Sequence, residues 1–375
     1  MRIAIVRQKY NPYGGAERFI ERALVALRAT GSVQLCVIAR AWTQKPGIDF
    51  IACDPPFRTS LGRDRSFAGA VIDLLATHRF DIVQSHERIP GLALYRAGDG
   101  VHASWLEQRA RVLPGWKRLA VAANPYHRYV LAAEREMFKH PALRAVICNS
   151  LMVRDDIARR FAPAPAALHV IHNGVDLEAY HPRVAARRDE IRGALGVRDD
   201  TPMFLYAGSG FERKGVAQLL RALARVAAPA CAVIAGADKH APRYRRLAMR
   251  LGLEKRAHFI GPAGNLGDWY GAADAFVLPT LYDPMPNAVL EALACGLPVV
   301  TTMQCGAREL IESGRNGVVL DALDIDGLAA ALSDLARPGR AGSMRAAARA
   351  SVEHLSLDTM ADRLLALYRT LAPAG

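Results

Sequence analysis

The order in which apolar runs and helical segments alternate constrains this chain of 375 residues more than any other feature. Short apolar runs typical of buried strands alternate with amphipathic segments typical of helices. This order predicts βαβ units and a parallel sheet covered by helices on both faces. In the first 150 residues, the strand-like runs are 3–6, 34–39, 81–85 and 145–149, and the helical segments are about 16–29, 66–78 and 127–139.

A second alternation follows a polar, arginine-rich stretch at 180–200, where we place a domain boundary. From Asp324 onward the pattern is helical only. We therefore expect two doubly wound α/β domains, at 1–180 and 181–355, and a last helix within 356–375. Two such sheets in tandem predict a ligand in a cleft between them, at the carboxyl ends of the strands. The strand-like runs of the second block are 203–208, 231–236, 258–261, 275–279 and 298–302.

Glycines and cations follow the first strand of the second domain. The run Ala-Gly-Ser-Gly-Phe-Glu-Arg-Lys-Gly-Val at 207–216 joins an apolar strand to a helix. Glycines such as Gly210 let the backbone approach a ligand, and the adjacent cations Arg213 and Lys214 suit a diphosphate. The run is neither a Walker A loop nor a G-x-G-x-x-G fingerprint. A plain strand-to-helix turn with solvent-facing charges explains the same residues.

A second cluster lies at 282–300, where a helix is expected to begin near Pro286. Its first N–H groups would form the positive end of a helix dipole, which favours a phosphate. Asp283 and Glu291 would repel a phosphate, so hydroxyl groups are their expected targets and the implied ligand is a sugar phosphate. Asp283 as a turn residue and Glu291 as a charge on the helix face is the competing interpretation. The N–H groups in question belong to Asn287, Ala288 and Val289.

The chain has 49 basic and 36 acidic residues, a net charge of +13. Part of the excess lies at 101–160, where eleven Arg and Lys outnumber five acidic residues and aromatic side chains are interleaved. This mixture suits the interface of an anionic membrane. Nucleic-acid binding, or a solvated face with buried aromatics, would have the same composition. The residues assigned to a membrane or acceptor patch are Trp105, Arg109, Arg111, Trp116, Lys117, Arg118 and Arg128.

The six cysteines have no metal-ligand spacing and lie mostly in apolar runs, which predicts reduced core thiols in a cytosolic protein. No run reaches the roughly 18–20 apolar residues that span a bilayer. The first residues read as a buried strand rather than a signal peptide. We therefore expect a protein without a membrane span, although it can still lie on a membrane.

These motifs carry a resemblance to a known family. Asp-Pro-Met-Pro-Asn-(x)3-Glu-Ala-(x)3-Gly-Leu-Pro-Val-Val at 283–300 resembles the carboxylate-x7-Glu signature of the retaining glycosyltransferases of family 4, which have the GT-B fold. The run at 207–216 resembles that family's Gly-x-x-x-x-x-Lys-Gly segment. The N-terminal portion looks most like the lipopolysaccharide-core glucosyltransferases that act on the first heptose. Further matching segments are 9–17, 88–92, 97–100, 126–129, 147–150 and 172–176.

The resemblance implies a nucleotide-sugar site in the second domain. Arg213 and Lys214 would neutralise the donor diphosphate, Glu291 would bind the ribose, and Asp283 would bind the transferred hexose. Asp283 stands where the family signature usually has Glu, so the donor sugar stays open. The glycines implied to approach the donor are Gly14, Gly15 and Gly210.

The resemblance also implies an acceptor site in the first domain, on which the last helix would pack. Asp99 matches the aspartate that faces the acceptor hydroxyl, and His102 is a competing candidate. No metal cofactor is expected, because Asp324-Ile325-Asp326, the one Asp-x-Asp in the chain, is better explained as a helix cap.

The implied activity is transfer of a hexose, expected to be glucose from UDP-glucose, to a lipopolysaccharide-core or related glycolipid. The expected partners are the nucleotide sugar, the glycolipid acceptor and the anionic cytoplasmic face of the inner membrane, and no nucleic acid. Two alternatives remain. One is a family 4 enzyme for another glycan, such as capsule, O-antigen or a small osmolyte. The other is a non-catalytic basic protein that binds nucleotide sugars or nucleic acid.

Overall fold

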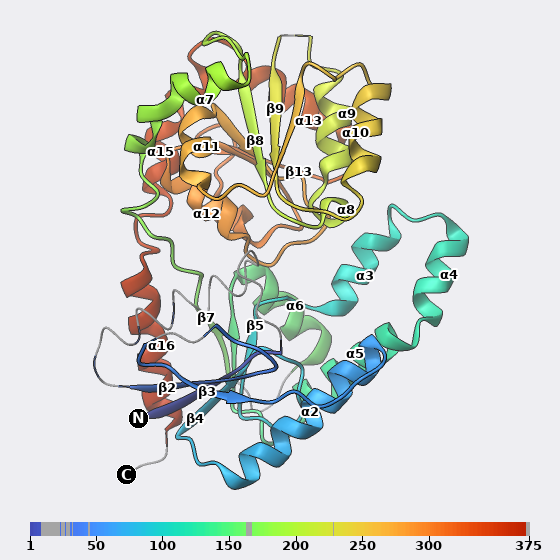
Figure 1. Cartoon of the computed structure of the whole chain (residues 1–375), viewed down its shortest axis with the longest axis vertical. Coiled ribbons are helices and arrows are strands. Elements are labelled where there is room, and N and C mark those ends of the chain that lie inside the picture. Colours follow the sequence, from blue (N-terminus) through green and yellow to red (C-terminus); the bar gives the residue numbers. More distant parts are fainter. Residues whose placement is uncertain are drawn as a thin grey trace. The chain divides into compact units, whose positions relative to one another are not determined.

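The computed structural model describes residues 1–8, 23, 27, 31, 33–43, 46–162, 167–227 and 229–372. The chain divides into two compact units, each an α/β structure built on a parallel sheet (Figure 1). The first unit is Met1–Gly174 together with Leu357–Gly375, and the second is Val175–Ser356. The sequence had placed these divisions at 180 and 355.

The first unit contains a sheet of seven strands in which every neighbouring pair is parallel. The chain adds strands on one side of β1 and then moves to its other side, so the strand order reverses between β1 and β4. In spatial order the strands are β3 (Asp49–Ala52), β2 (Gln34–Ala39), β1 (Arg2–Val6), β4 (Ile82–Ser85), β5 (Leu94–Ala97), β6 (Ala145–Cys148) and β7 (Ala167–Val170).

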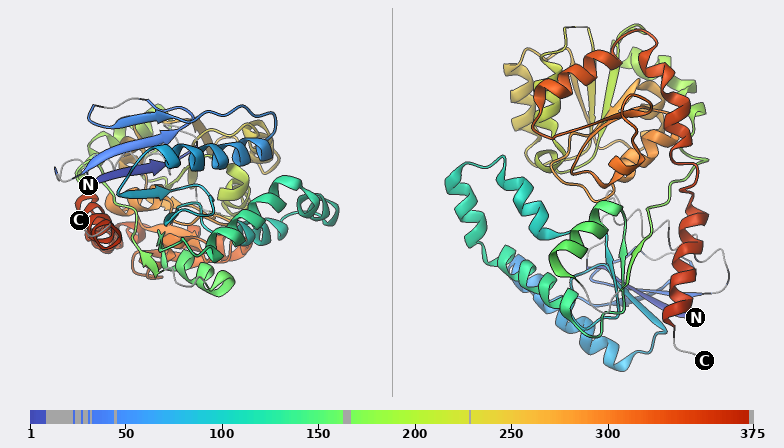
Figure 2. Two further views of the ribbon diagram at one scale, coloured as in Figure 1. Left: turned by 90° about the horizontal axis from the view of Figure 1, so that it is seen from below. Right: turned by 180° about the vertical axis from the view of Figure 1, so that it is seen from behind.

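Alternate residues of the first strand are buried against opposite layers of helices, as the two-residue period of a strand requires. Ile3 and Ile5 share a core with α16, whereas Ala4 and Val6 share one with α2. The hydroxyl of Tyr368 on α16 donates a hydrogen bond to Gln84 Oε1 at 2.8 Å. Figure 2 shows α16 lying along the first unit. The helices of this unit are α2 (Ser60–Thr77), α3 (His102–Ala110), α4 (Gly115–Ala123), α5 (Pro125–Lys139), α6 (Leu151–Phe161) and α16 (Leu357–Leu371).

The second unit repeats this topology with six parallel strands. Here the strand order reverses between β8 and β11. In spatial order the strands are β10 (Ala257–Gly261), β9 (Cys231–Ala235), β8 (Met203–Ala207), β11 (Ala275–Val277), β12 (Val299–Thr302) and β13 (Gly317–Leu320).

Helices cover both faces of this second sheet (Figure 1). α9, α10 and α13 lie on one face, and α7, α11, α12 and α15 lie on the other. The bounds are α7 (Arg188–Ala194), α8 (Phe211–Lys214), α9 (Val216–Leu223), α10 (Ala241–Arg250), α11 (Leu266–Ala272), α12 (Asn287–Ala294), α13 (Ile325–Leu335), α14 (Arg340–Ser343) and α15 (Arg345–Ala350), with 3-10 turns at Pro182–Arg187 and Gly306–Leu310.

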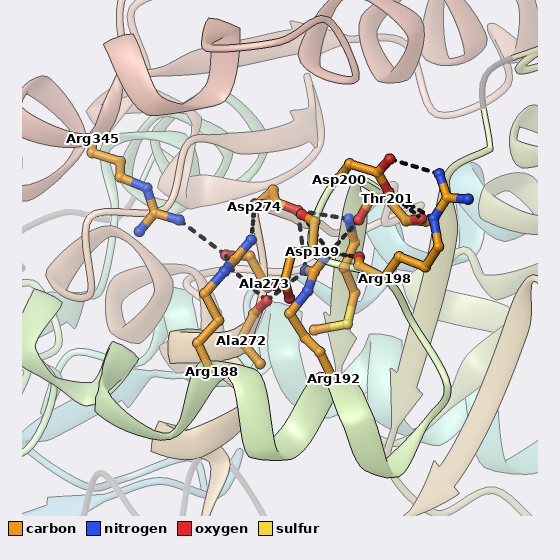
Figure 3. A network of polar contacts seen from close by, with 11 residues as sticks. Arg188, Arg192, Arg198, Asp199, Asp200, Thr201, Ala272, Ala273, Asp274 and Arg345 are labelled. Atoms are coloured by element: carbon orange, nitrogen blue, oxygen red, sulfur yellow. Dashed lines mark hydrogen bonds and ion pairs between the residues drawn. The ribbon is translucent and has the colours of Figure 1, made fainter.

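Part of the arginine excess has a structural role inside the second unit (Figure 3). Arg192 on α7 is fully buried and donates hydrogen bonds to the carbonyls of Ala272 and Arg198 at 3.1 and 2.7 Å. Arg188 pairs with Asp274 at 2.6 Å, and the other oxygen of that carboxylate accepts the N–H of Met203 at 2.8 Å. These guanidinium groups form hydrogen bonds within the second unit, and they join α7 to the start of the sheet.

All nine predicted strands are confirmed, and the sequence missed four, namely β3, β5, β7 and β13. β5 was not predicted because it carries Arg96, which breaks the apolar pattern of the strand. In the structure Arg96 is fully buried and donates to Asn173 Oδ1 at 2.6 Å. The helical segments at 66–78 and 127–139 are confirmed as α2 and α5. Most of the predicted helix at 16–29 lies outside the described residues.

Candidate functional site

The turn after β8 brings a cation over a glycine. The Lys214 side chain runs across Gly208, where a Cβ atom would lie 2.8 Å from the lysine Cδ and 2.9 Å from Nζ. The adjacent strand end is equally close, because a Cβ on Gly236 would lie 2.2 Å from the carbonyl oxygen of Gly208. The glycines at these strand ends therefore let Lys214 cross the edge of the sheet.

α8, which carries both cations, is fixed at its two ends. Gly210 precedes it with φ +77°, and the Asp238 carboxylate accepts the N–H of Phe211 at 2.7 Å. Gly215 follows it with φ +82°, and a Cβ there would lie 1.9 Å from the carbonyl oxygen of Pro279. Only glycine allows both this left-handed conformation and this approach to the loop after β11.

Arg213 and Lys214 converge on one carboxylate, that of Asp283. The distances from Arg213 Nη1 and Lys214 Nζ to Asp283 Oδ2 are 3.1 and 3.2 Å. Burial alone would raise the pKa of Asp283, but the Lys214 and Arg213 charges outweigh it and hold the pKa below its usual value. The carboxylate is therefore ionised at neutral pH. Because two cations share one anion, the cluster has a net positive charge.

The loop that carries Asp283 is held by its own backbone. The N–H of Asp283 donates to the carbonyl of Gln304 at 3.0 Å, and its carbonyl accepts from Gly306 at 2.8 Å. The carbonyl of Arg213 accepts two bonds, from the Leu281 N–H at 2.7 Å and the Thr280 hydroxyl at 3.0 Å. The cations and their carboxylate are thus placed by hydrogen bonds that do not depend on a ligand.

α12 begins at Asn287, one residue later than expected. Pro286 is its N-cap, with φ −71° and ψ 119°, and not its first helical residue. The N–H of Val289 donates to the carbonyl of Pro286 at 3.0 Å. The prediction that three N–H groups point outward is therefore wrong for Val289, because this N–H closes the first turn. Asn287 and Ala288 remain the N–H groups at the positive end of the helix.

Glu291, on the second turn of α12, is fully buried. Its Oε2 accepts a hydrogen bond from the Tyr270 hydroxyl at 3.0 Å, and the same hydroxyl lies 3.2 Å from the carbonyl of Ala288. The sequence did not single out Tyr270, which holds this carboxylate beside the first turn of the helix.

A cavity of about 220 Å³ lies in the first unit, at the carboxyl ends of β1 and β4. Asp99 is on its wall. The Asp99 carboxylate is half exposed and pairs with Arg7, with an Nη1–Oδ2 distance of 3.3 Å. Burial would raise the pKa of Asp99, but Arg7 and Arg88 lower it below its usual value. The lining residues are Arg7, Gln8, Arg63, Asp64, Phe67, Ala68, Glu87, Arg88, Ile89, Asp99, Tyr126, Tyr129, Val130 and Ala133.

His102 is not on that wall. Its Nε2 lies 3.0 Å from Nδ1 of His127, and its backbone N–H donates to the buried Glu134 carboxylate. Burial, together with Arg88 and His127, lowers the pKa of His102 to about 3. The imidazole is therefore neutral at physiological pH and a weak base. Of the two candidates for assisting the acceptor, Asp99 lines the cavity and His102 does not.

The predicted membrane or acceptor patch lies on α3, α4 and α5. No residue of α4 is buried, and Trp116 and Leu119 are 69% and 74% exposed. Lys117 lies over the Trp116 ring at 5.1 Å, and Arg109 lies over the Trp105 ring at 5.9 Å. The exposed basic side chains of the patch are Arg111, Lys117, Arg118 and Arg128.

Other residues of the 101–160 segment have different roles. Phe138 is buried and packs against Tyr95 and Phe161, so it belongs to the core. On α6, Arg160 pairs with Glu107 of α3 and with Asp156, 2.8 Å from its Nε. Phe138 and Arg160 are therefore not part of the patch on α3, α4 and α5.

Two of the predicted donor residues, Gly14 and Gly15, lie outside the described residues. Asp324 caps α13 as predicted, because its Oδ1 accepts the N–H of Gly327 at 2.8 Å. All six cysteines are buried and unpaired. Among the residues that the structure describes, no three His, Cys, Asp or Glu side chains are grouped to hold a metal ion. Over the same ranges, no helix is long and apolar enough to cross a membrane.

Comparison with known families shows to which family the chain belongs. Family models match over residues 13–179, as "Glycosyltransferase Family 4", and over 201–337, as "Glycosyl transferases group 1". A D-inositol 3-phosphate glycosyltransferase from Xylanimonas cellulosilytica is 31% identical over 309 residues, which cover 77% of this chain and 72% of the relative. The chain belongs to the family 4 glycosyltransferases.

Individual proteins resemble the chain over most of its length. The lipopolysaccharide glucosyltransferase WaaG from Escherichia coli is 26% identical over 328 residues, 85% of each protein. A crystal structure of WaaG matches 98% of this chain and 99% of its own, with a TM-score of 0.84 and 23% identity. Anabaena Alr3699/HepE, solved with UDP and glucose, matches 99% of this chain and all of its own at a TM-score of 0.74 and 20% identity. The predicted GT-B fold is confirmed.

Several residues that build the Asp283 cluster of the second unit or the cavity of the first unit were not found from the sequence. Asp238, Gly236 and Tyr270 position α8 and Glu291, and Arg7 and Glu87 line the cavity of the first unit. One signal was available for some of them, since polar residues and glycines directly after strands gather at one edge of a parallel sheet. Tyr270 lies inside a helix and gave no such signal.

Proposed function

We propose that this glycosyltransferase moves a hexose, glucose from UDP-glucose, to a lipopolysaccharide-core or related glycolipid with retention of the anomeric configuration. The observation that carries the proposal is the convergence of Arg213 and Lys214 on Asp283 beside the first turn of α12. A net positive cluster at the end of a strand suits a diphosphate. The similarity to WaaG supports glucose and a lipopolysaccharide acceptor, and the UDP bound to HepE supports a uridine donor.

The chemistry follows from where charge develops. As the bond between sugar and phosphate breaks through an oxocarbenium-like transition state, negative charge grows on the departing diphosphate. Arg213, Lys214 and the N–H of Ala288 are the groups that would stabilise this charge, because their positions are set before a donor binds. Asp283 and Glu291 would accept hydrogen bonds from the hexose and the ribose. Attack by the acceptor on the face of the leaving group would retain the configuration.

The experiment that tests this function is a donor panel. Purified full-length protein is given UDP-, GDP- and ADP-linked hexoses with a glycolipid extract, and both hydrolysis and transfer are measured. UDP-glucose should be used fastest, and the product should have the α configuration of the donor. No turnover of any nucleotide sugar would reject the function, whereas turnover of another donor would reject only the assignment of glucose.

We assign the exposed residues of α4 and its neighbours to an anionic membrane surface at the cytoplasmic face of the inner membrane. Trp116 and Leu119 are three residues apart and share a helix face, with Lys117 and Arg118 between them. An exposed apolar pair among cations is typical of helices that lie in the membrane interface.

Vesicle sedimentation tests this assignment. Full-length protein should sediment with vesicles containing phosphatidylglycerol and not with pure phosphatidylcholine, and Trp116→Ala with Leu119→Ala should reduce binding about ten-fold. The matched control is Leu151→Ala, at an exposed position on α6. Tighter binding to RNA than to the anionic vesicles at the same salt concentration would contradict the membrane assignment.

Transfer to another glycan is the second candidate. The observation in its favour is the 31% identity to a D-inositol 3-phosphate glycosyltransferase, whose name states a small phosphorylated acceptor. Adding inositol 3-phosphate to the acceptor panel separates the two candidates, because only one of them predicts transfer to it.

A further inference from the structure

The cavity of the first unit lies where a doubly wound sheet binds ligands. Its wall includes Arg7 and Gln8, the two residues after β1, and Glu87, two residues after the end of β4, and the strand order reverses between these two strands. This switch point is the usual ligand position in open α/β sheets. At about 220 Å³, the cavity is below the roughly 300–1,000 Å³ typical of drug-sized ligands, so it suits a group the size of one ring.

The charges on this wall are compensated. Arg7 Nη1 lies 3.4 Å from Glu87 and 3.3 Å from Asp99, and Arg63 Nε donates to Asp64 at 2.7 Å. The third arginine of the wall pairs with a buried carboxylate behind it, at 2.8 Å between Arg88 Nε and Glu134 Oε1. Each guanidinium on the wall therefore already contacts a carboxylate. Among the described lining residues, three arginines face the three carboxylates Asp64, Glu87 and Asp99, so an anionic ligand would meet no excess of cations.

The remaining side chains suit hydroxyl groups and a ring. Asp64 accepts hydrogen bonds from Gln8 Nε2 at 3.2 Å and from Arg63, and it raises the pKa of Tyr126, which burial also raises. Tyr126 and Tyr129, both half-buried, supply aromatic surface from α5. Carboxylates that accept from hydroxyls, beside aromatic faces, are a chemistry suited to a sugar ring.

We propose that this cavity binds one uncharged glycosyl unit of the acceptor and discriminates against a unit that carries a phosphate. Asp64, Glu87 and Asp99 accept hydrogen bonds from its hydroxyls, and Tyr126 and Tyr129 contact its ring. The proposal rests on the proposed function, since it gives a substrate class to the acceptor domain of that transferase.

The test measures binding and does not need turnover. Methyl α-glycosides of glucose, mannose, galactose and a heptose are titrated, each beside its phosphate monoester, into full-length protein saturated with UDP, with saturation-transfer NMR as the readout. At least one neutral glycoside should bind, and its phosphate ester should bind at least ten-fold more weakly. A phosphate ester that binds equally well or better would overturn the proposal, and so would a failure of all neutral glycosides to bind.

Two variants make the charge argument specific. Asp64→Asn and Glu87→Gln each raise the charge of the wall by one, so each should weaken the neutral glycoside about ten-fold and lower its advantage over the phosphate ester. The matched control is Asp73→Asn, an exposed carboxylate elsewhere on α2, which should leave both affinities unchanged. UDP affinity, which reports the second unit, should be the same in all three variants.

The outcomes separate this proposal from the function on which it rests. If Asp64→Asn and Glu87→Gln bind UDP normally and keep the wild-type preference for the neutral glycoside, the cavity does not select by charge. If the wild-type protein turns over no nucleotide sugar in the donor panel, the proposed function fails, whatever the cavity binds.

Discussion

Both units place polar side chains at the point where the strand order reverses, between β1 and β4 in the first unit and between β8 and β11 in the second. In the second unit, Arg213 and Lys214 share the single carboxylate of Asp283. In the first unit, every arginine of the cavity wall contacts at least one carboxylate. Arg7 contacts two of them, Glu87 and Asp99. The topology is the same at these two positions, whereas the local balance between arginine or lysine and carboxylates differs.

The difference between the units also shows that the net charge of a chain does not reveal where an anion can bind. The chain has a net charge of +13, yet Arg188 and Arg192 are committed to Asp274 and to backbone carbonyls. Only cations in excess over their neighbouring carboxylates can attract an anion. Among the described residues, the Asp283 cluster and the exposed face of α4 have such an excess, and the wall of the first unit's cavity does not.

The largest expected effect is on the positive cluster of the second unit. Lys214→Ala should lower turnover by roughly 10²–10³-fold, because it removes a preorganised charge from the departing diphosphate. Lys255→Ala, at an exposed position in the same unit, should have no effect on turnover. Steady-state kinetics with saturating donor measures both. Near-normal turnover of Lys214→Ala would contradict a role for the positive cluster of the second unit in the reaction.

The second prediction concerns the glycines that place the cluster. Gly215→Ala should destabilise the second unit by roughly 2–4 kcal/mol, from left-handed strain plus the clash with Pro279. Gly210→Ala has a similar φ but open space around it, so it should cost only about 1–2 kcal/mol. Thermal unfolding, with hydrogen exchange of peptides from β8 and β11, measures both. Equal losses of stability in the two variants would mean that the close approach of Gly215 to Pro279 does not contribute to the cost of the substitution.

Salt should separate the two sites. Raising NaCl from 50 to 500 mM should weaken UDP binding several-fold, because the ligand charge and the Arg213 and Lys214 charges are screened. Binding of a neutral methyl glycoside to the cavity should change by less than two-fold. Calorimetric titrations of each ligand measure this, and a parallel loss for both would show that charge does not distinguish the units.

The smallest expected effect is a flat pH dependence. The pKa of Asp99 lies below its usual value and that of His102 is about 3, so neither group changes charge between pH 5.5 and 7.5. Asp99 stays ionised and His102 stays neutral, and neither group should produce an acidic limb in kcat/KM over this range. An acidic limb with an apparent pKa near 6.5 that disappears in His102→Gln would instead identify His102 as the acceptor base.

Much of the fold was predictable because its signal is local. The nine apolar runs that alternate with amphipathic segments are all strands, since a strand buried on both faces must be continuously apolar. The strand β5 was missed because it carries Arg96, whose guanidinium is buried and donates to Asn173 Oδ1, a contact that only the tertiary structure makes. Burial lowers the pKa of Arg96 to about 9, which shows how unusual this position is.

The sequence predicted which residues lie in the Asp283 cluster and on α12, but it did not predict how they pair. Sequence spacing identified Arg213, Lys214, Asp283 and Glu291, but treated the cations and carboxylates as having separate partners. It also assigned an outward N–H to Val289, which instead closes the first turn of α12. The pairing of side chains from different strand ends depends on the order of the strands in the sheet. Local periodicity in the sequence does not reveal that order.

The sequence by itself determined two doubly wound α/β domains, a family 4 glycosyltransferase signature and an excess of positive charge. Only the tertiary structure decided which of those charges are compensated, because Arg7 meets Asp99 across 92 positions of the chain and Arg213 meets Asp283 across 70. Composition counts charges wherever they occur, whereas a ligand responds to those within a few ångströms. That difference in range is why the same arginine-rich chain has a net positive cluster at Asp283 and a charge-balanced cavity wall in the first unit.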